Sequence, residues 1–242
     1  MELILMLAAA AALAAPGIGI GAGAVVPRPV VPRPVVVELF TSQACSSCPP
    51  ADALLRRLAA RDKDILALDL HVTYWNGPAY RDPYALAAAT ARQNWYARVH
   101  PAATVYTPEA VIDGGAGLVG SREAAMGAAI AAARARIELR PAVPIRIADR
   151  AGGLSIALGA EPVVGGAAAV LLFGYDRSHT THAGGGENAG ATLSEIDVVR
   201  SVTRLGTWRG RARTFTLPRP AGQRVAVLIQ AADGTILGAA RQ

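Results

Sequence analysis

The sequence is poor in the residues that mark several common classes of protein. In 242 residues it has two cysteines, four histidines and, among 24 basic residues, one lysine, Lys63. The arginines that give the formal net charge of +6 are scattered along the chain rather than clustered. Because binding to the phosphates of a nucleic acid requires a concentrated basic face, we expect no nucleic-acid partner.

The amino-terminal part of the chain differs in composition from the rest. Residues 3–26 carry no charged side chain, and an apolar core over 3–15 is followed by a proline, a glycine and small residues. This pattern predicts that 1–24 is a secretory signal peptide, although the usual positive residues are missing and the run is long enough for an uncleaved anchor. A repeated Val-Val-Pro-Arg-Pro over 25–34 predicts a stiff linker. We expect a periplasmic or secreted protein that contacts a membrane only where this segment is not cleaved.

Both cysteines fall in one motif, Cys-Ser-Ser-Cys at positions 45–48. An apolar, β-branched run over 35–40 predicts a buried strand before the motif, and the residues after it predict a helix. Unpaired N–H groups and the dipole at a helix start favour a thiolate, which lowers a cysteine pKa from about 8.5 to roughly 3.5–7.5. We therefore expect Cys45 to be the nucleophile and Cys48 the resolving thiol. Glu38, on the strand that leads to the motif, is the candidate proton acceptor for Cys48.

Two other interpretations of the cysteine pair stay open, an inert disulfide and a soft-metal site. A disulfide between residues three apart closes so small a loop that its entropic contribution is slight, which argues against a purely structural use. A metal site needs further ligands, and the sequence offers few. His179 and His182, with Glu187 nearby, are weak candidates for a zinc or copper site. We expect no metal and no cofactor.

Hydrophobic periodicity predicts an α/β fold over residues 35–140. The run 65–72 predicts a second buried strand, and the helical crossover that precedes it implies that this strand pairs in parallel with the first. Helical periodicity covers 83–99 and 122–138, and 105–112 predicts a further strand.

Beyond residue 140 the pattern changes to the short alternation that is typical of strands. The strand signals lie at 154–158, 168–173, 196–205, 224–230 and 235–238. An Asp-Gly turn between the last two predicts a hairpin, and the glycine-rich stretch 178–192 predicts a connecting loop. We expect residues 141–242 to form a separate all-β domain, an antiparallel sheet or sandwich, packed on the α/β domain.

The order strand, CxxC, helix, and then Thr107-Pro108 before a strand that ends in glycine resembles the thioredoxin fold. The resemblance implies that Pro108 is cis and faces the CxxC, and that Thr107 pairs with an extended substrate backbone. It also places Glu38 near the position of the buried acid of thioredoxins. Tyr74 and Trp75 either wall a substrate groove beside the cysteines or pack against the edge of the sheet.

Blocks in both halves of the chain resemble DUF1223, an exported thioredoxin-like family of unknown function. They are 38–43 with 45–52, His71-Val72 with Tyr74-Trp75, 91–93, 106–108, 186–190, 198–200 and 236–240. The resemblance covers about residues 35–240 and implies a fold and a compartment but no established reaction. Ala44 stands where the family usually has glycine, and a positive φ there would strain the loop by about 1 kcal/mol. Thr73 and Asn76 stand where acidic residues are common.

Together these features predict a thioredoxin-like α/β domain over 35–140 and an all-β domain over 141–242. The predicted activity is thiol-disulfide exchange with an extracytoplasmic protein or a small thiol, which would make the protein a thiol-disulfide oxidoreductase. The alternatives are a binding protein without turnover, in which the loop 186–190 recognises a ligand and the disulfide is passive, and a copper- or zinc-binding protein.

Overall fold

The computed structural model describes residues 33–100, 104–162 and 166–242. The predicted signal peptide or anchor, 1–24, and nearly all of the proline-rich linker lie outside the described residues. Within the described ranges no helix combines the length and the hydrophobicity needed to cross a bilayer.

The elements of the first half follow the order predicted from the sequence. They are β1 (Val35–Thr41), α1 (Pro49–Arg61), β2 (Ile65–His71), α2 (Ala87–Val99), β3 (Glu109–Ile112), β4 (Gly117–Val119) and α3 (Glu123–Glu138). The predicted parallel pairing is confirmed, with Val35 opposite Ile65. Helix α2 begins four residues later than predicted because the chain first turns at Asp82, whose carbonyl accepts the amide of Ala85. Strand β4 was not predicted from the sequence.

The second half is all β. Its strands are β5 (Ile145–Arg150), β6 (Gly153–Leu158), β7 (Ala168–His182), β8 (Thr192–Trp208), β9 (Arg213–Leu217), β10 (Arg224–Gln230) and β11 (Ile236–Arg241). The predicted hairpin of β10 and β11 is confirmed. Strands β5, β6 and β9 form a small sheet of their own, and β5 and β9 were not predicted.

The prediction of a thioredoxin-like α/β domain followed by a separate all-β domain is wrong. One mixed sheet of eight strands runs through both halves in the order β11-β10-β7-β8-β2-β1-β3-β4, and the halves join where Asp69 of β2 pairs with Val198 of β8. The join lies inside 196–205, which was predicted as a strand, but its partner β2 belongs to the other predicted domain. Strands β7 and β8 are also far longer than their apolar runs. They pair from Ala168 and Trp208 out to His182 and Thr192, through polar residues that the sequence pattern assigned to a loop.

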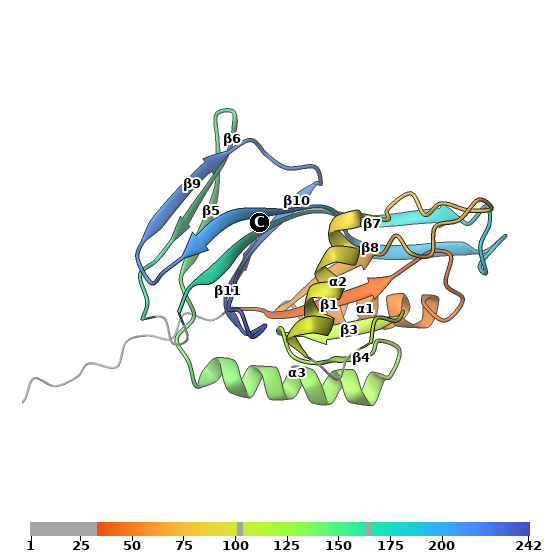
Figure 1. The fold of residues 1–242 in the computed structure, drawn as a ribbon, viewed down its shortest axis with the longest axis horizontal. Coiled ribbons are helices and arrows are strands. Elements are labelled where there is room, and N and C mark those ends of the chain that lie inside the picture. The colour runs from red at the N-terminus through yellow and green to blue at the C-terminus, as the bar shows by residue number, and fades with distance from the viewer. Residues whose placement is uncertain (1–32, 101–103, 163–165) are drawn as a thin grey trace, which may run out of the picture.

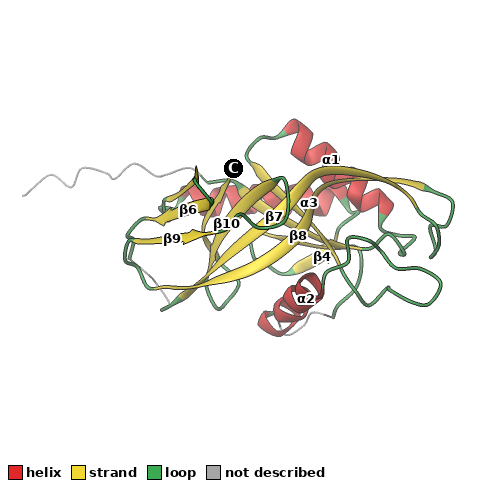
Figure 2. Ribbon diagram, turned by 90° about the horizontal axis from the view of Figure 1, so that it is seen from above, coloured by secondary structure: helices red, strands yellow, loops and turns green. Residues whose placement is uncertain are grey.

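The helices cover both faces of this sheet, as Figure 2 shows. Helices α1 and α3 pack on one face against the apolar side chains of β1 that include Val37 and Leu39. Helix α2 lies on the opposite face, where Tyr96 packs with Phe40. The β7–β8 hairpin extends to the end of the sheet where β1 leads into α1 (Figure 1). Residues from both halves of the chain therefore meet at the CxxC motif.

Candidate functional site

The two cysteines form a disulfide at the start of α1. Cys48 is the residue that precedes the first turn of the helix, and its carbonyl accepts the amides of Ala51 and Asp52. Both cysteines are buried, with 1% of Cys45 and none of Cys48 exposed. The sulfur atoms thus lie at the helix start that the sequence predicted, but beneath the protein surface.

Thr107, the residue before Pro108, contacts the disulfide. The peptide bond between Thr107 and Pro108 is cis. The Thr107 hydroxyl donates to Cys45 Sγ at 3.2 Å, and the Trp75 indole N–H donates to the same hydroxyl at 2.7 Å. Tyr74 is 44% exposed beside them. Of the residues predicted to bind substrate, Thr107 therefore contacts Cys45 directly and Trp75 contacts it through Thr107.

Glu38 does not join this group. Its neighbours Val37 and Leu39 face α1, so the alternation of the strand directs Glu38 to the other face of the sheet. There its carboxylate is bound by the Arg92 guanidinium and by the Tyr96 hydroxyl, which donates at 2.9 Å. The structure therefore does not bring the predicted proton acceptor to Cys48.

Asp52 is the carboxylate that lies one helical turn beyond Cys48. Residues four apart share one face of a helix, so Asp52 follows Cys48 along the buried side of α1. It accepts a hydrogen bond from the Thr41 hydroxyl at 3.0 Å. Burial, with a smaller contribution from the charge of Asp69, raises the pKa of Asp52 well above its usual value. The i, i+4 spacing from Cys48 was the sequence signal for this residue.

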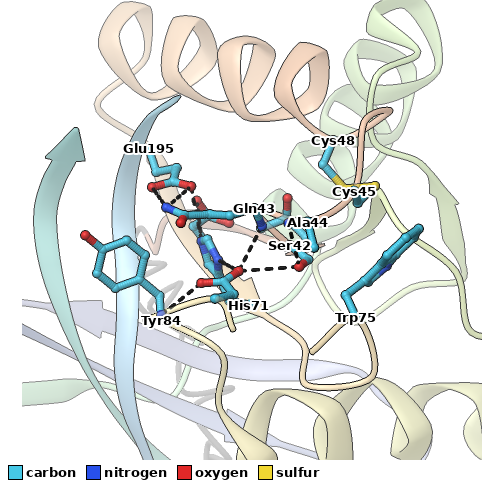
Figure 3. A network of polar contacts seen from close by, with 12 residues as sticks. Ser42, Gln43, Ala44, Cys45, Cys48, His71, Trp75, Tyr84 and Glu195 are labelled. Atoms are coloured by element: carbon cyan, nitrogen blue, oxygen red, sulfur yellow. Dashed lines mark hydrogen bonds and ion pairs between the residues drawn. A yellow bond between two sulfur atoms is a disulfide. The ribbon is translucent and has the colours of Figure 1, made fainter. Parts of the chain in front are cut away.

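A buried histidine links three segments beneath the cysteine loop (Figure 3). His71 Nδ1 lies 2.7 Å from an oxygen of Asp82, and Nε2 lies 3.6 Å from Asp69 and 4.0 Å from Glu195. The side-chain amide of Gln43 donates to both oxygens of Glu195 at 2.9 Å. His71 is thus a core histidine, but carboxylates surround it.

This cluster holds more acidic groups than bases. Burial lowers the pKa of His71, but Asp69 and Asp82 outweigh burial and hold that pKa well above its usual value. Burial opposes ionisation of Asp82, yet the hydrogen bond and charge of His71 lower its pKa overall. Burial raises the pKa of Glu195 to about 7 and also raises that of Asp69. Around neutral pH Glu195 is therefore only partly ionised, whereas Asp82 carries its charge.

Some polar atoms of this cluster lack hydrogen-bond partners. Neither oxygen of Asp69 has one among the described residues, and the same holds for Nε2 of His71. No group of three or more histidine, cysteine or acidic side chains in the described part of the chain is arranged to hold a metal ion. His179, one of the weak candidates for a metal ligand, instead contacts Asp176 at 2.9 Å.

The tip of the β7–β8 hairpin covers the cysteine loop. Glu187 Oε2 accepts the Ser46 amide at 2.9 Å and the Ser46 hydroxyl at 2.7 Å. The Asn188 side chain donates to the carbonyls of Gln43 at 3.0 Å and Cys45 at 2.9 Å. The block 186–190 that carried the family resemblance is therefore part of this site.

Ala44 is free of the backbone strain that a positive φ would bring. Among the described residues other than glycine, only Asp113 and Asp197 have a positive φ. The close approach at this point is made by Gly186, where an added Cβ would lie 2.8 Å from Ala44 Cα. Asn76, at one of the departures from the family pattern, accepts the amide of Asp82 at 3.0 Å.

The comparisons with known proteins agree with these features of sequence and structure. The family model described as "Protein of unknown function (DUF1223)" matches residues 36–230. The chain belongs to the DUF1223 family. A structural-genomics crystal structure from Agrobacterium tumefaciens is 31% identical, with a TM-score of 0.73 over 88% of this chain and 95% of the other.

A second similar structure is HBP35 of Porphyromonas gingivalis. It is 10% identical, with a TM-score of 0.64 over 89% of this DUF1223 chain and 76% of that chain, and at this identity the likeness concerns the fold alone. No curated protein matches.

Proposed function

We propose that this DUF1223 protein carries out thiol-disulfide exchange outside the cytoplasm through Cys45 and Cys48. The observation that carries the proposal is the position of the pair. The disulfide lies at a helix start, with a hydroxyl donor 3.2 Å from Cys45 Sγ and a buried carboxyl group one turn beyond Cys48. Helix starts and hydrogen-bond donors stabilise a thiolate, which is the reactive form of cysteine.

In the reducing direction, the Cys45 thiolate attacks one sulfur of a partner disulfide. A bond between Cys45 and that sulfur forms while the partner's S–S bond breaks, and the other partner sulfur leaves as a thiolate. Cys48 then attacks Cys45 Sγ, which breaks the mixed disulfide and restores the Cys45–Cys48 bond. The partner has gained two electrons, and the reverse steps oxidise a partner dithiol.

Asp52 is the proposed acceptor of the Cys48 thiol proton. Cys48 is fully buried, so its proton has to pass to a group inside the protein. Asp52 shares the buried face of α1 with Cys48, whereas the Glu38 carboxylate is bound by Arg92 on the other side of the sheet. A carboxyl group whose pKa is raised well above its usual value is a better proton acceptor and donor near the pH at which thiols exchange than an ordinary carboxylate.

The proposed substrates are an extended segment of an extracytoplasmic protein or a small thiol. Thr107 and Trp75 border Cys45 through a chain of two hydrogen bonds. Tyr74 adds an exposed aromatic surface beside them. These three residues would position the substrate sulfur toward Cys45.

The test is the trapping of an exchange intermediate. In Cys48→Ser the nucleophile remains but cannot be released, so this variant is expected to accumulate a mixed disulfide with its partner in cells. Cys45→Ser, the matched control, removes the nucleophile and is expected to accumulate none. If neither variant traps a partner while both fold as the wild type does, the proposal is wrong.

A binding protein with a passive disulfide is the second candidate. The burial of both cysteines, at 1% and 0% exposure, favours it. Alkylation of the folded protein after mild reduction separates the two functions. A reactive Cys45 is labelled rapidly at neutral pH, whereas the thiols of a buried structural pair are labelled only when the protein unfolds.

A further inference from the structure

The second half of the chain places a carboxylate on the residue that directly follows the nucleophilic cysteine. Glu187 lies in the loop between β7 and β8, 141 residues beyond Ser46. One of its oxygens, Oε2, accepts both the Ser46 amide at 2.9 Å and the Ser46 hydroxyl at 2.7 Å. Glu187 is therefore the hydrogen-bond acceptor for the backbone N–H group that directly follows Cys45.

That N–H group belongs to the residue that directly follows Cys45, just before the start of α1 at Pro49. Free amides at a helix start favour the thiolate, and a nearby negative charge disfavours it. The hydrogen bonds from the Ser46 amide and hydroxyl hold the pKa of Glu187 below its usual value, so this residue is ionised at neutral pH. Glu187 thus acts against the thiolate-stabilising environment at the start of α1.

We propose that Glu187 sets the redox preference of the Cys45–Cys48 pair, by disfavouring the Cys45 thiolate and thereby stabilising the disulfide. This inference rests on the proposed exchange function and gives it a direction. A pair whose disulfide is the more stable state passes its two electrons to partner disulfides, so the protein would be a reductant of extracytoplasmic disulfides.

The position of the loop does not depend on the charge of Glu187 alone. The Glu187 amide donates to the Ala44 carbonyl at 3.1 Å, and Asn188 donates to the carbonyls of Gln43 and Cys45. Because both bonds from Ser46 reach a single oxygen of Glu187, a glutamine can accept both through its carbonyl. Glu187→Gln is therefore a substitution that removes the charge and keeps the contacts.

The experiment is a redox titration of the folded protein with reduced and oxidised glutathione. Reduction breaks the Cys45–Cys48 bond, with two electrons and two protons supplied as two molecules of glutathione become one of its disulfide. Glu187→Gln is expected to shift the equilibrium about two- to fivefold toward the dithiol. The thiolate absorbance of Cys45 is expected to appear at lower pH in this variant than in the wild type.

The control is Glu123→Gln, which removes an exposed charge that pairs with Arg57 on the outer side of α1. We expect no shift in that variant. The shift in Glu187→Gln should shrink in 1 M salt, where the screening length is about 3 Å, whereas an effect of altered packing would persist. An unchanged equilibrium in Glu187→Gln, or a shift that salt leaves intact, overturns the assignment.

These outcomes separate the inference from the function on which it rests. If glutathione reduces the wild-type pair reversibly and Glu187→Gln titrates as the wild type does, the assignment of Glu187 fails while exchange stands. If the folded wild type is not reduced reversibly, both fail.

Discussion

Two buried polar clusters lie on opposite faces of the same sheet and differ in how completely their groups are paired. Around Glu38, the carboxylate is bound by Arg92 and Tyr96, and Arg92 also donates to Gln230 at 3.0 Å. Around His71, Asp69 has no hydrogen-bond partner for either oxygen among the described residues. The first cluster pairs one acid with one base, and the second gathers four carboxyl groups near one histidine.

This difference separates a network that stabilises the fold from one that can take up and release protons. A buried ion pair whose hydrogen bonds are satisfied holds its elements together and has little reason to exchange protons. An excess of buried acids perturbs the pKa values of its members, which is the condition found at sites that handle protons. The comparison predicts that substitutions near Glu38 change stability, and that those near His71 and Asp52 change the response to pH.

The largest expected effect is on stability, in the Glu38 cluster. Arg92→Leu leaves the carboxylate of Glu38 buried without its cationic partner, which is expected to cost about 3–5 kcal/mol of unfolding free energy. Urea denaturation measures the loss. Arg57→Leu, which breaks an exposed pair with Glu123, is the matched control and should cost at most about 1 kcal/mol. A loss of similar size in the two variants would contradict the role given to this cluster.

The second effect is a decline in stability with rising pH, caused by the His71 cluster. Folded Glu195 keeps its proton up to about pH 7, while the unfolded chain releases it near the ordinary value of 4.5. The folded state therefore binds more protons between these values, so stability is lost as pH rises through them. His71 acts in the same direction, because its folded pKa is raised and its contribution is lost at still higher pH.

We expect wild-type stability to fall by about 2 kcal/mol between pH 5 and pH 8 on account of Glu195. Glu195→Gln cannot release a proton there and should show a flatter profile. Denaturation at a series of pH values tests this expectation. A decline as steep in Glu195→Gln as in the wild type would remove Glu195 as its source.

The smallest of these effects is on rate, and it compares the two acids directly. Asp52→Asn removes the proposed proton acceptor of Cys48 and is expected to slow resolution of a mixed disulfide by about tenfold or more, with a flatter dependence on pH. The rate is followed as glutathione is released from Cys45 in single-turnover experiments. Glu38→Gln should resolve at the wild-type rate. The opposite pattern would return the role of proton acceptor to Glu38.

Much of the site could be predicted from residues that are adjacent in the sequence. The CxxC at a strand-to-helix turn and the Thr107-Pro108 pair were recognisable as local patterns. Glu38 was misleading because its spacing from Cys45 says nothing about the face on which an alternating strand directs it. Arg92, which binds the Glu38 carboxylate on the other face of the sheet, lies 54 positions away on another element.

The fold was predicted well where apolar periodicity is strong and poorly where it stops. Strand β7 continues for nine residues beyond Phe173 because β8 supplies its hydrogen bonds. The side chains of these residues show no apolar pattern from which the pairing could be predicted. The join between Asp69 and Val198 made one sheet of two expected domains. The extension of β7 and β8 carries Glu187 to Ser46, a contact that no local signal could reveal.

The most direct test of the proposed exchange function is whether glutathione reduces and reforms the Cys45–Cys48 disulfide in the folded protein. We expect a reversible two-electron titration, with the two thiols accessible to alkylation while the tertiary structure is retained. A disulfide that resists reduction until the chain unfolds would contradict it and would assign the pair to a passive role.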